Sequence, residues 1–295
     1  MKMLQLLRGL VLLPLSLASA SCVEARPAHP ALWKVSSPTS TIYFLGTIHA
    51  LPKGEDWHTP AIIKAEAEAD TLVLELSDGA DHDKITSAIN ALAFAPNLPD
   101  VLDRVPANKR AKVEAVLAHG ETPLAALKNY KTWAVFFFAI NPQLFKTLGV
   151  DGDEGVEHKL TADFTAAHKQ IDGLETVRSQ LGIFDALPEA LQRRLLVESI
   201  DDIPRAKAEF YQSLRAWEAG DPAAIARSFD TDLKSEPQLA RVLLHDRNAN
   251  WAQWTIARLK KPGVTLVAVG AGHLAGNDSL LAMLRAKGLK IVRVG

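Results

Sequence analysis

The chain has 295 residues, of which 48% are hydrophobic and 23% are charged, and its formal net charge at pH 7 is −1. This composition is typical of a globular protein that buries a sizeable core. The near-neutral charge offers no basic surface for nucleic acid and no charged block for an anionic membrane. The single cysteine, Cys22, excludes an intrachain disulfide.

The first 25 residues have the features of an export signal. Basic residues precede a short apolar run at residues 9–17, and an Ala-x-Ala cleavage pattern follows it. The run is shorter than the roughly 20 residues that span a membrane, and no later run is long and apolar enough to do so. Lipidation of Cys22 would require a leucine-like residue where Ser19 stands, so we favour ordinary cleavage over a lipoprotein. We expect a signal peptide over residues 1–25 and a periplasmic or secreted product.

The next segment predicts a hairpin and a crossover. Two apolar runs, at residues 31–35 and 41–48, flank a Ser- and Pro-rich turn, which is typical of a β-hairpin. Thr59 then precedes Pro60, the pattern of an N-cap followed by the first residue of a helix. The apolar run at residues 71–76 predicts another strand. Strand, helix and strand in this order indicate a right-handed βαβ crossover between parallel strands.

Helical patterns dominate the middle of the chain. They cover residues 84–148 and about 190–260, with an expected break at Pro204, and we interpret both stretches as helical insertions. The remaining strands are expected at residues 170–176, 264–269 and 291–294. The sequence therefore predicts an α/β fold in which a mixed, largely parallel central sheet is flanked by helices. We expect a single domain over residues 26–295.

Two predicted strands end in the same motif. Gly46 is followed three positions later by His49, and Gly270 is followed by Gly272 and then His273. Glycine lets the backbone turn tightly or approach a ligand, and the carboxyl ends of strands in open α/β sheets line ligand crevices. Taken alone, either histidine could be a loop residue that hydrogen-bonds to nearby backbone. The matching sequence motifs around the two histidines instead favour a shared site. Neutral imidazole serves as a metal ligand or as a general base.

Three glutamates are further candidates. Glu75 lies near the end of strand 71–76 between two leucines, and the crossover geometry puts it beside His49. Glu157 follows a Gly-rich turn where a helix begins, and its alternative role is to complement the helix dipole. Glu175 ends a strand-like run, where a solvated carboxylate is the alternative.

Arg247 and Asn248 lie on a predicted helix before the last strands. Arg247 is suited to pair with a site carboxylate or to bind an oxyanion, and an exposed helix arginine is the alternative. The acid-rich stretch 151–154 lacks the ligand spacing of a calcium loop. The sequence contains no Gly-x-Ser-x-Gly elbow, no Walker loop and no His-Glu-x-x-His.

Taken together and in this order, the motifs resemble the TraB/GumN family, the bacterial relatives of the Tiki proteases. The resemblance rests on residues 43–49, 72–76, 155–157, 174–176, 247–251 and 269–276. Tiki proteases are divalent-metal-dependent peptidases, and the wider superfamily is similar to erythromycin esterase and to a haem-binding lipoprotein. The resemblance implies an α/β site built from two Gly-x-x-His motifs and an early glutamate, but it does not specify a substrate.

The expected function is that of an exported, divalent-metal-dependent hydrolase with peptidase-like chemistry. By resemblance, His49, Glu75 and His273 are the expected ligands of the ion. Two imidazoles and a carboxylate would leave a position for water, whose pKa the ion lowers. Mn, Co or Zn would suit these mixed nitrogen and oxygen ligands, since no thiolate is available.

Other residues complete the expected site. Glu157 or Glu175 would act as general base, and Arg247 would stabilise the developing oxyanion. The alternative function is a non-catalytic periplasmic binding protein that sequesters a peptide or small ligand without turnover. Either function implies a peptide or small-molecule partner and no nucleic acid, and the sequence does not specify the oligomeric state.

Overall fold

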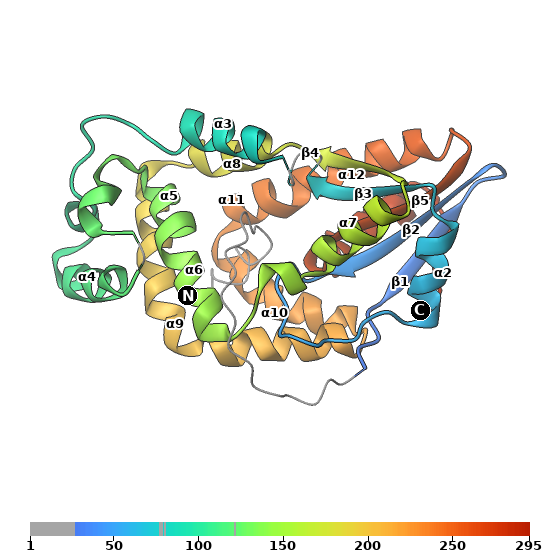
Figure 1. Ribbon diagram of the computed structural model, residues 1–295, viewed down its shortest axis with the longest axis horizontal. Coiled ribbons are helices and arrows are strands. Elements are labelled where there is room, and N and C mark those ends of the chain that lie inside the picture. Colours follow the sequence, from blue (N-terminus) through green and yellow to red (C-terminus); the bar gives the residue numbers. More distant parts are fainter. Residues whose placement is uncertain (1–26, 77–78, 80, 121) are drawn as a thin grey trace. The chain divides into compact units, whose positions relative to one another are not determined.

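A computed structural model describes residues 27–76, 79, 81–120 and 122–295 (Figure 1). The chain divides into two compact units. The helical unit comprises the described parts of residues 78–149 and 175–209, and the sheet unit comprises the described parts of residues 5–77, 150–174 and 210–295. The predicted signal peptide and Cys22 lie outside the described residues.

The described residues include a six-stranded sheet with the strand order β4-β3-β5-β2-β1-β6. Its strands are β1 (Leu32–Ser36), β2 (Ser40–Thr47), β3 (Thr71–Leu76), β4 (Gln170–Glu175), β5 (Gly263–Gly270) and β6 (Val292–Arg293). Strands β2 and β3 both pair with β5 in parallel, whereas β1 runs antiparallel to β2 and to β6. The sheet is mixed and largely parallel, which confirms the predicted α/β class and the predicted hairpin.

Helices flank the sheet and form the helical unit. The sheet unit contains α2 (Pro60–Glu68), α7 (Val156–Ala166), α10 (Pro222–Ser235), α11 (Pro237–Ala240), α12 (Asp246–Arg258) and α13 (Leu280–Ala286). The helical unit contains α3 (His82–Leu92), α4 (Arg110–Ala118), α5 (Thr132–Val135), α6 (Asn141–Leu148) and α8 (Val177–Asp185). Helix α9 (Glu189–Glu218) begins in the helical unit and ends in the sheet unit. In the described part of the chain, no helix is long and apolar enough to cross a membrane.

The structure corrects one predicted helix break and confirms one predicted helix start. The expected break at Pro204 is wrong, because α9 continues through it. Proline removes one hydrogen bond of the helix ladder, but buried side chains on both sides, such as Ile200 and Ala206, hold the helix in place. The predicted start of α2 is confirmed, since the Thr59 side chain accepts a hydrogen bond from the Ile62 N–H.

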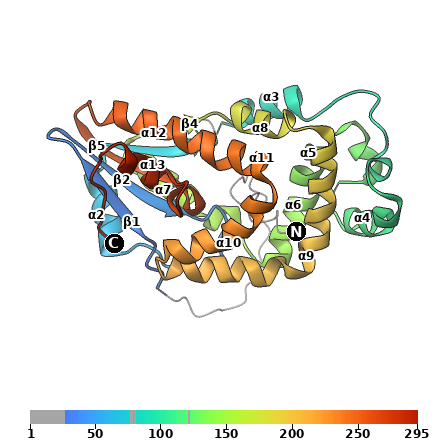
Figure 2. The same cartoon turned by 180° about the vertical axis from the view of Figure 1, so that it is seen from behind.

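The two faces of the sheet pack against different helices. Side chains alternate along a strand, so Phe44 faces the core with α12 and α13, through residues such as Trp251 and Leu284. On the opposite face, the Tyr43 hydroxyl donates to Glu68 of α2 at 2.6 Å. Helix α7 contacts β3, and α2 contacts β5. Figures 1 and 2 show the sheet and its helices from opposite sides.

The position of β5 decides where the site lies. Strands β2 and β3 are parallel, as the predicted crossover requires, but β5 lies between them. Strands β2 and β5 pair along their whole length, from Ser40 opposite Gly263 to Thr47 opposite Gly270. The two Gly-x-x-His loops therefore begin side by side, although 224 positions separate the histidines, 273 − 49 in the numbering of the chain.

Trp217, near the end of α9, fixes the end of β2. Its buried indole Nε1 donates to the main-chain carbonyl of Gly46 at 2.7 Å. We expect Trp217→Phe to lower the free energy of unfolding by about 1–3 kcal/mol, because the buried carbonyl loses its donor. Urea denaturation measures the change. Trp254→Phe, at a tryptophan partly buried against the core, is the matched control. An equal loss of unfolding free energy in both variants would contradict a stabilising role for the Trp217 hydrogen bond.

Candidate functional site

Three predicted site residues surround the α-carbon of Gly270. A Cβ placed on Gly270 would lie 3.2 Å from Glu75 Oε1, 3.4 Å from His49 Nε2 and 3.8 Å from His273 Cδ2. The N–H of Gly270 donates to Glu75 Oε1 at 2.8 Å. The structure therefore brings His49, Glu75 and His273 together at the carboxyl ends of β2, β3 and β5. Only glycine leaves the space between them open.

Arg247, in the first turn of α12, bridges Glu75 and His273. Its Nη2 donates to Glu75 Oε2 at 2.6 Å, and its Nη1 lies 3.0 Å from His273 Nε2. The guanidinium also lies over the ring of Trp251, 4.7 Å from its centroid. The Arg247 and Glu75 side chains are each only 6% exposed, so this is a buried ion pair. Burial raises the pKa of Glu75, but Arg247, together with the two histidines and the Gly270 N–H, more than offsets this and the pKa falls to about 2.

Asn248 fixes the proton position on His273. Its Nδ2 donates to the main-chain carbonyl of Asp278 at 2.9 Å, so its Oδ1 faces His273 Nδ1, at 2.8 Å. The amide oxygen only accepts, so Nδ1 carries the proton and Nε2 accepts from Arg247. Burial, followed by the Arg247 charge, lowers the pKa of His273 to about 3. His273 is therefore neutral at physiological pH, with both ring nitrogens hydrogen-bonded.

His49 pairs with Glu157 instead. His49 Nδ1 lies 2.6 Å from Glu157 Oε1, and the Thr47 hydroxyl donates to the same oxygen. Burial lowers the pKa of His49, but the charge and hydrogen bond of Glu157, together with the charge of Glu75, outweigh this effect and the pKa rises to about 9. His49 Nε2 and Glu157 Oε2 are buried and have no hydrogen-bond partner in the part of the chain that the structure describes. The pair thus presents an open imidazole nitrogen beside Gly270.

Gly155 allows α7 to bring Glu157 to His49. The N–H of Val156 donates to the main-chain carbonyl of Ile48 at 3.2 Å, which ties the start of α7 to the end of β2. A Cβ on Gly155 would collide with the carbonyl group of His49. Glu157 lies in the first turn of α7, where the helix dipole favours a carboxylate, so the two roles weighed for it are compatible.

The other predicted residues have defined positions. Gly46 lies against the second loop, since a Cβ on it would be 3.2 Å from Ala271 Cα. Gly272 lies in the 3-10 turn Ala271–Leu274, which presents His273. Glu175 ends β4, is half-buried and belongs to the helical unit, so its role as general base stays a prediction.

The sequence profile of the TraB/PrgY/gumN family matches residues 31–293. The chain belongs to this family. It is also similar to the uncharacterized protein YbaP of Escherichia coli (strain K12) and of Shigella flexneri, with 29% identity over 140 residues in each case. The match covers 47% of this chain and 50% of each relative, so the chain spans about half the length of the curated relatives it matches. No solved structure gives a significant match.

In this TraB-family site, Thr47 has a role that the sequence analysis did not assign. Thr47 and Tyr43 lie on the same face of β2, toward α2 and α7, because side chains alternate along a strand. Glu75 and Val73 share the opposite face, toward α12. The alternation was available in the sequence, but which helix covers each face is a tertiary property.

The predicted metal ligands are committed to other partners in this arrangement. His273 Nε2 and both Glu75 oxygens lie within hydrogen-bonding distance of Arg247 or Gly270. The positively charged Arg247 guanidinium lies between these expected ligand atoms, and it repels a metal ion placed beside them. Of the expected ligand atoms, His49 Nε2 has no hydrogen-bond partner among the residues described by the structure. The three side chains, as arranged here, do not fit an ion, and the predicted Mn, Co or Zn site stays a prediction.

Proposed function

We propose that this TraB-family protein is a hydrolase that activates water at His49 and acts on peptides or related acyl compounds. The observation that carries the proposal is the buried His49 Nε2, which has no hydrogen-bond partner among the described residues and faces the space beside Gly270. Glu157 holds the other ring nitrogen. An imidazole oriented by a carboxylate, with its second nitrogen open, is suited to general-base catalysis.

In the proposed reaction, water next to His49 Nε2 attacks the acyl carbon of the substrate. The water proton passes to Nε2 as the new carbon–oxygen bond forms, and Glu157 stabilises the resulting imidazolium. His49 then delivers this proton to the leaving nitrogen or oxygen as the scissile bond breaks. Arg247 contributes a buried positive charge, and stabilisation of the oxyanion remains its proposed role. Arg247 also holds Glu75 and His273 in place.

A peptide mixture tests the proposed hydrolysis. The wild-type protein and His49→Gln are incubated with the mixture, with and without EDTA, and mass spectrometry records new termini. We expect products with the wild type only, and we expect them to persist in EDTA because no proposed step uses an ion. Intact peptide retained by both proteins without any product would instead indicate the alternative binding protein. Cleavage abolished by EDTA would favour the predicted ion.

The pH dependence of the rate tests the base role directly. We expect kcat/KM to rise about tenfold per pH unit below pH 9 and to level off above it, because only neutral His49, with its pKa of about 9, accepts a proton. Glu157→Gln removes the charge that raises the pKa of His49, so the inflection should move to lower pH. Profiles with an uncharged substrate measure both effects. A rate that falls as the pH rises through 9 would assign His49 as an acid instead.

The proposal includes location and partners. The expected signal peptide at residues 1–25 supports a periplasmic or secreted product, and the near-neutral charge of −1 supports a peptide or small-molecule partner rather than nucleic acid. The location is tested by measuring the intact mass of protein from the envelope fraction. This protein should lack the first 20 to 25 residues, which are the predicted signal peptide.

A further inference from the structure

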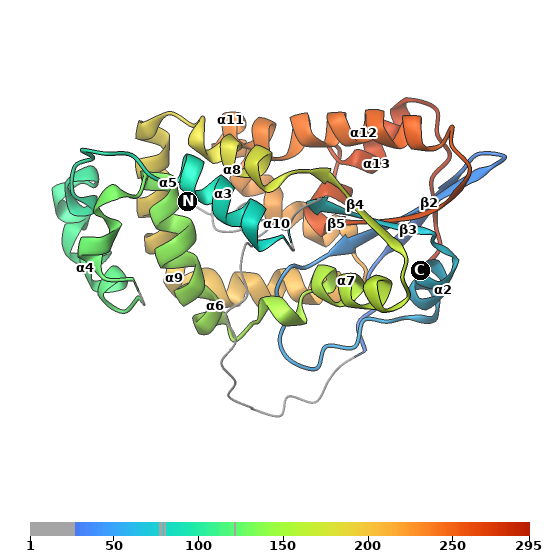
Figure 3. The same ribbon diagram turned by 45° about the horizontal axis from the view of Figure 1, so that its top comes forward.

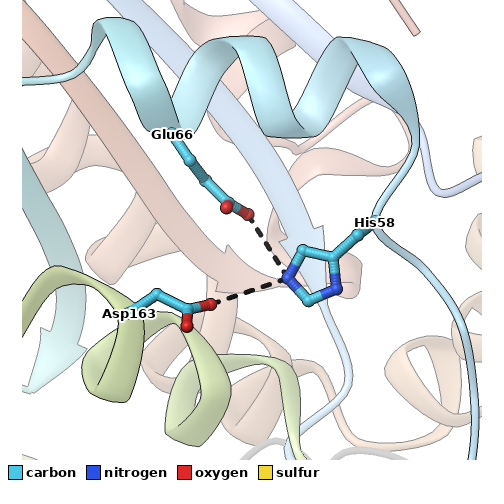
Figure 4. Close-up of side chains that lie close together, drawn as sticks. All are labelled: His58, Glu66 and Asp163. Carbon is cyan, nitrogen blue, oxygen red and sulfur yellow. Dashed lines mark ion pairs between the residues drawn. The ribbon is translucent and has the colours of Figure 1, made fainter. Parts of the chain in front are cut away.

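His58, Glu66 and Asp163 form a second cluster of ionisable side chains in the sheet unit (Figure 4). His58 precedes α2, Glu66 lies in α2, and Asp163 lies in α7. Figures 1 and 3 both show α2 beside α7. One ligand atom from each of the three residues lies within 4.8 Å of the others. Figure 4 shows the imidazole pointing between the two carboxylates.

The cluster is not satisfied by its own hydrogen bonds. His58 Nε2 lies 3.7 Å from Glu66 Oε1 and 3.7 Å from Asp163 Oδ2, beyond hydrogen-bonding distance of both. Glu66 Oε1 is buried and has no hydrogen-bond partner within residues 27–76, 79, 81–120 and 122–295. Within the described part of the chain, the cluster therefore contains a buried carboxylate oxygen that no side chain of the cluster reaches by a hydrogen bond.

Trp57 and Lys169 lie beside the cluster and restrict the positions of its side chains. The indole of Trp57 stacks on the His58 ring with centroids 3.8 Å apart, which fixes the plane of the imidazole. Lys169 Nζ donates to the main-chain carbonyls of Glu66 and Ala67, at 2.8 and 2.9 Å. These bonds hold the ammonium against the backbone of α2.

The spacing matches that of ligands around one ion. Zinc binds imidazole nitrogen and carboxylate oxygen at about 2.0–2.2 Å, so two such ligands in tetrahedral geometry lie about 3.3–3.6 Å apart. The observed distances of 3.7 Å from His58 Nε2 to both carboxylates are close to this value. One imidazole and two carboxylates are also a mixed donor set that first-row transition ions accept, whereas Mg²⁺ prefers oxygen ligands alone.

We propose that His58, Glu66 and Asp163 bind one divalent transition-metal ion, such as Zn²⁺, with water in the remaining position. The ion joins α2, and the segment that leads into it, to α7. Since α7 also carries Glu157, the ion stabilises the helix that orients His49, from a site separate from the site around Gly270. The ligand groups come from two segments far apart in the sequence, residues 58–66 and Asp163 of α7, so the ion is a cross-link within the sheet unit.

Thermal unfolding with added metal tests the proposal. For the wild type, ZnCl₂ at 100-fold above the dissociation constant should raise Tm by about 5 °C or more, because the ion binds only the folded chain. MgCl₂ should give no comparable rise. His58→Ala and Asp163→Asn should lose the response. His245→Ala is the matched control, because His245 pairs with Asp278 at the surface, 2.7 Å away, and it should respond like the wild type.

A further variant separates this site from the one predicted around His49. His49→Gln should keep the full Zn²⁺ response. Isothermal titration calorimetry should give one Zn²⁺ per wild-type chain. The affinity should be at least about 100-fold lower in Asp163→Asn. Because the Asp163 side chain is half-exposed, we expect this variant to fold. The proposal is overturned if the wild type shows no Zn²⁺-dependent rise. It is equally overturned if the response survives in His58→Ala and Asp163→Asn but disappears in His49→Gln.

Discussion

Arg247→Met is expected to lower the free energy of unfolding by about 3–5 kcal/mol at pH 7, the largest stability effect of any single change in the site. The reason is the buried ion pair, in which Arg247 Nη2 lies 2.6 Å from Glu75 Oε2 and each side chain is only 6% exposed. Without the guanidinium, the Glu75 carboxylate must stay charged in a buried position or take up a proton. Urea denaturation followed by far-UV circular dichroism measures the loss.

The double variant Arg247→Met with Glu75→Gln is the control. It replaces the pair by neutral groups and should recover part of the lost stability, because breaking a buried pair costs more than removing both partners. Arg247→Lys should fall between these variants, since it keeps the charge but not the two-pronged contact with Glu75 and His273. A double variant less stable than either single variant would contradict this account.

The stability difference should also depend on pH. The pKa of Glu75 is lowered from 4.5 to about 2, so its contribution is fully present above the unfolded value and is lost as the pH falls toward 2. The difference between the wild type and Arg247→Met should therefore shrink between pH 4.5 and pH 2. A difference that stays constant over this range would show that another interaction of Arg247 dominates.

His49→Gln is expected to reduce hydrolysis by about 10²–10⁴-fold, the effect of removing a general base. This variant also deprives Glu157 of its partner at 2.6 Å, so its stability loss should exceed that of a surface change. Comparing kcat with the free energy of unfolding separates the two effects. A variant that keeps wild-type turnover would exclude His49 as the base.

Gly270→Ala tests the same centre without touching a titratable group. The new methyl group would lie 3.2 Å from Glu75 Oε1 and 3.4 Å from His49 Nε2, in the space where the attacking water must sit. We expect a fall in kcat comparable to that of His49→Gln, while the His49–Glu157 pair remains. Gly182→Ala is the matched control, because a Cβ there would meet no described atom within 4 Å apart from its chain neighbours and the backbone of its own helix. Full activity in Gly270→Ala would place the reaction elsewhere.

The local elements of the sheet unit were determined by the sequence itself. Apolar runs between turn residues predicted β2, β3 and β5, and the Thr59–Pro60 pair predicted the start of α2, because strand and cap preferences depend on neighbouring residues. The two Gly-x-x-His motifs and the resemblance to TraB-family proteins identified His49, Glu75, His273 and Arg247 as one candidate set. The structure places these four side chains in contact with, or adjacent to, one another.

Only the tertiary structure decided how these groups are paired. Alternation along a strand says which residues share a face but not which helix covers it, so it did not reveal that Glu75 meets Arg247 while Thr47 and Glu157 meet His49. The position of β5 between β2 and β3, which aligns the two histidine loops, depends on hydrogen bonds between distant segments. The cluster of His58, Glu66 and Asp163 exists only because α2 and α7 pack on the same face of the sheet. Such contacts arise from long-range packing, which a local sequence pattern does not encode.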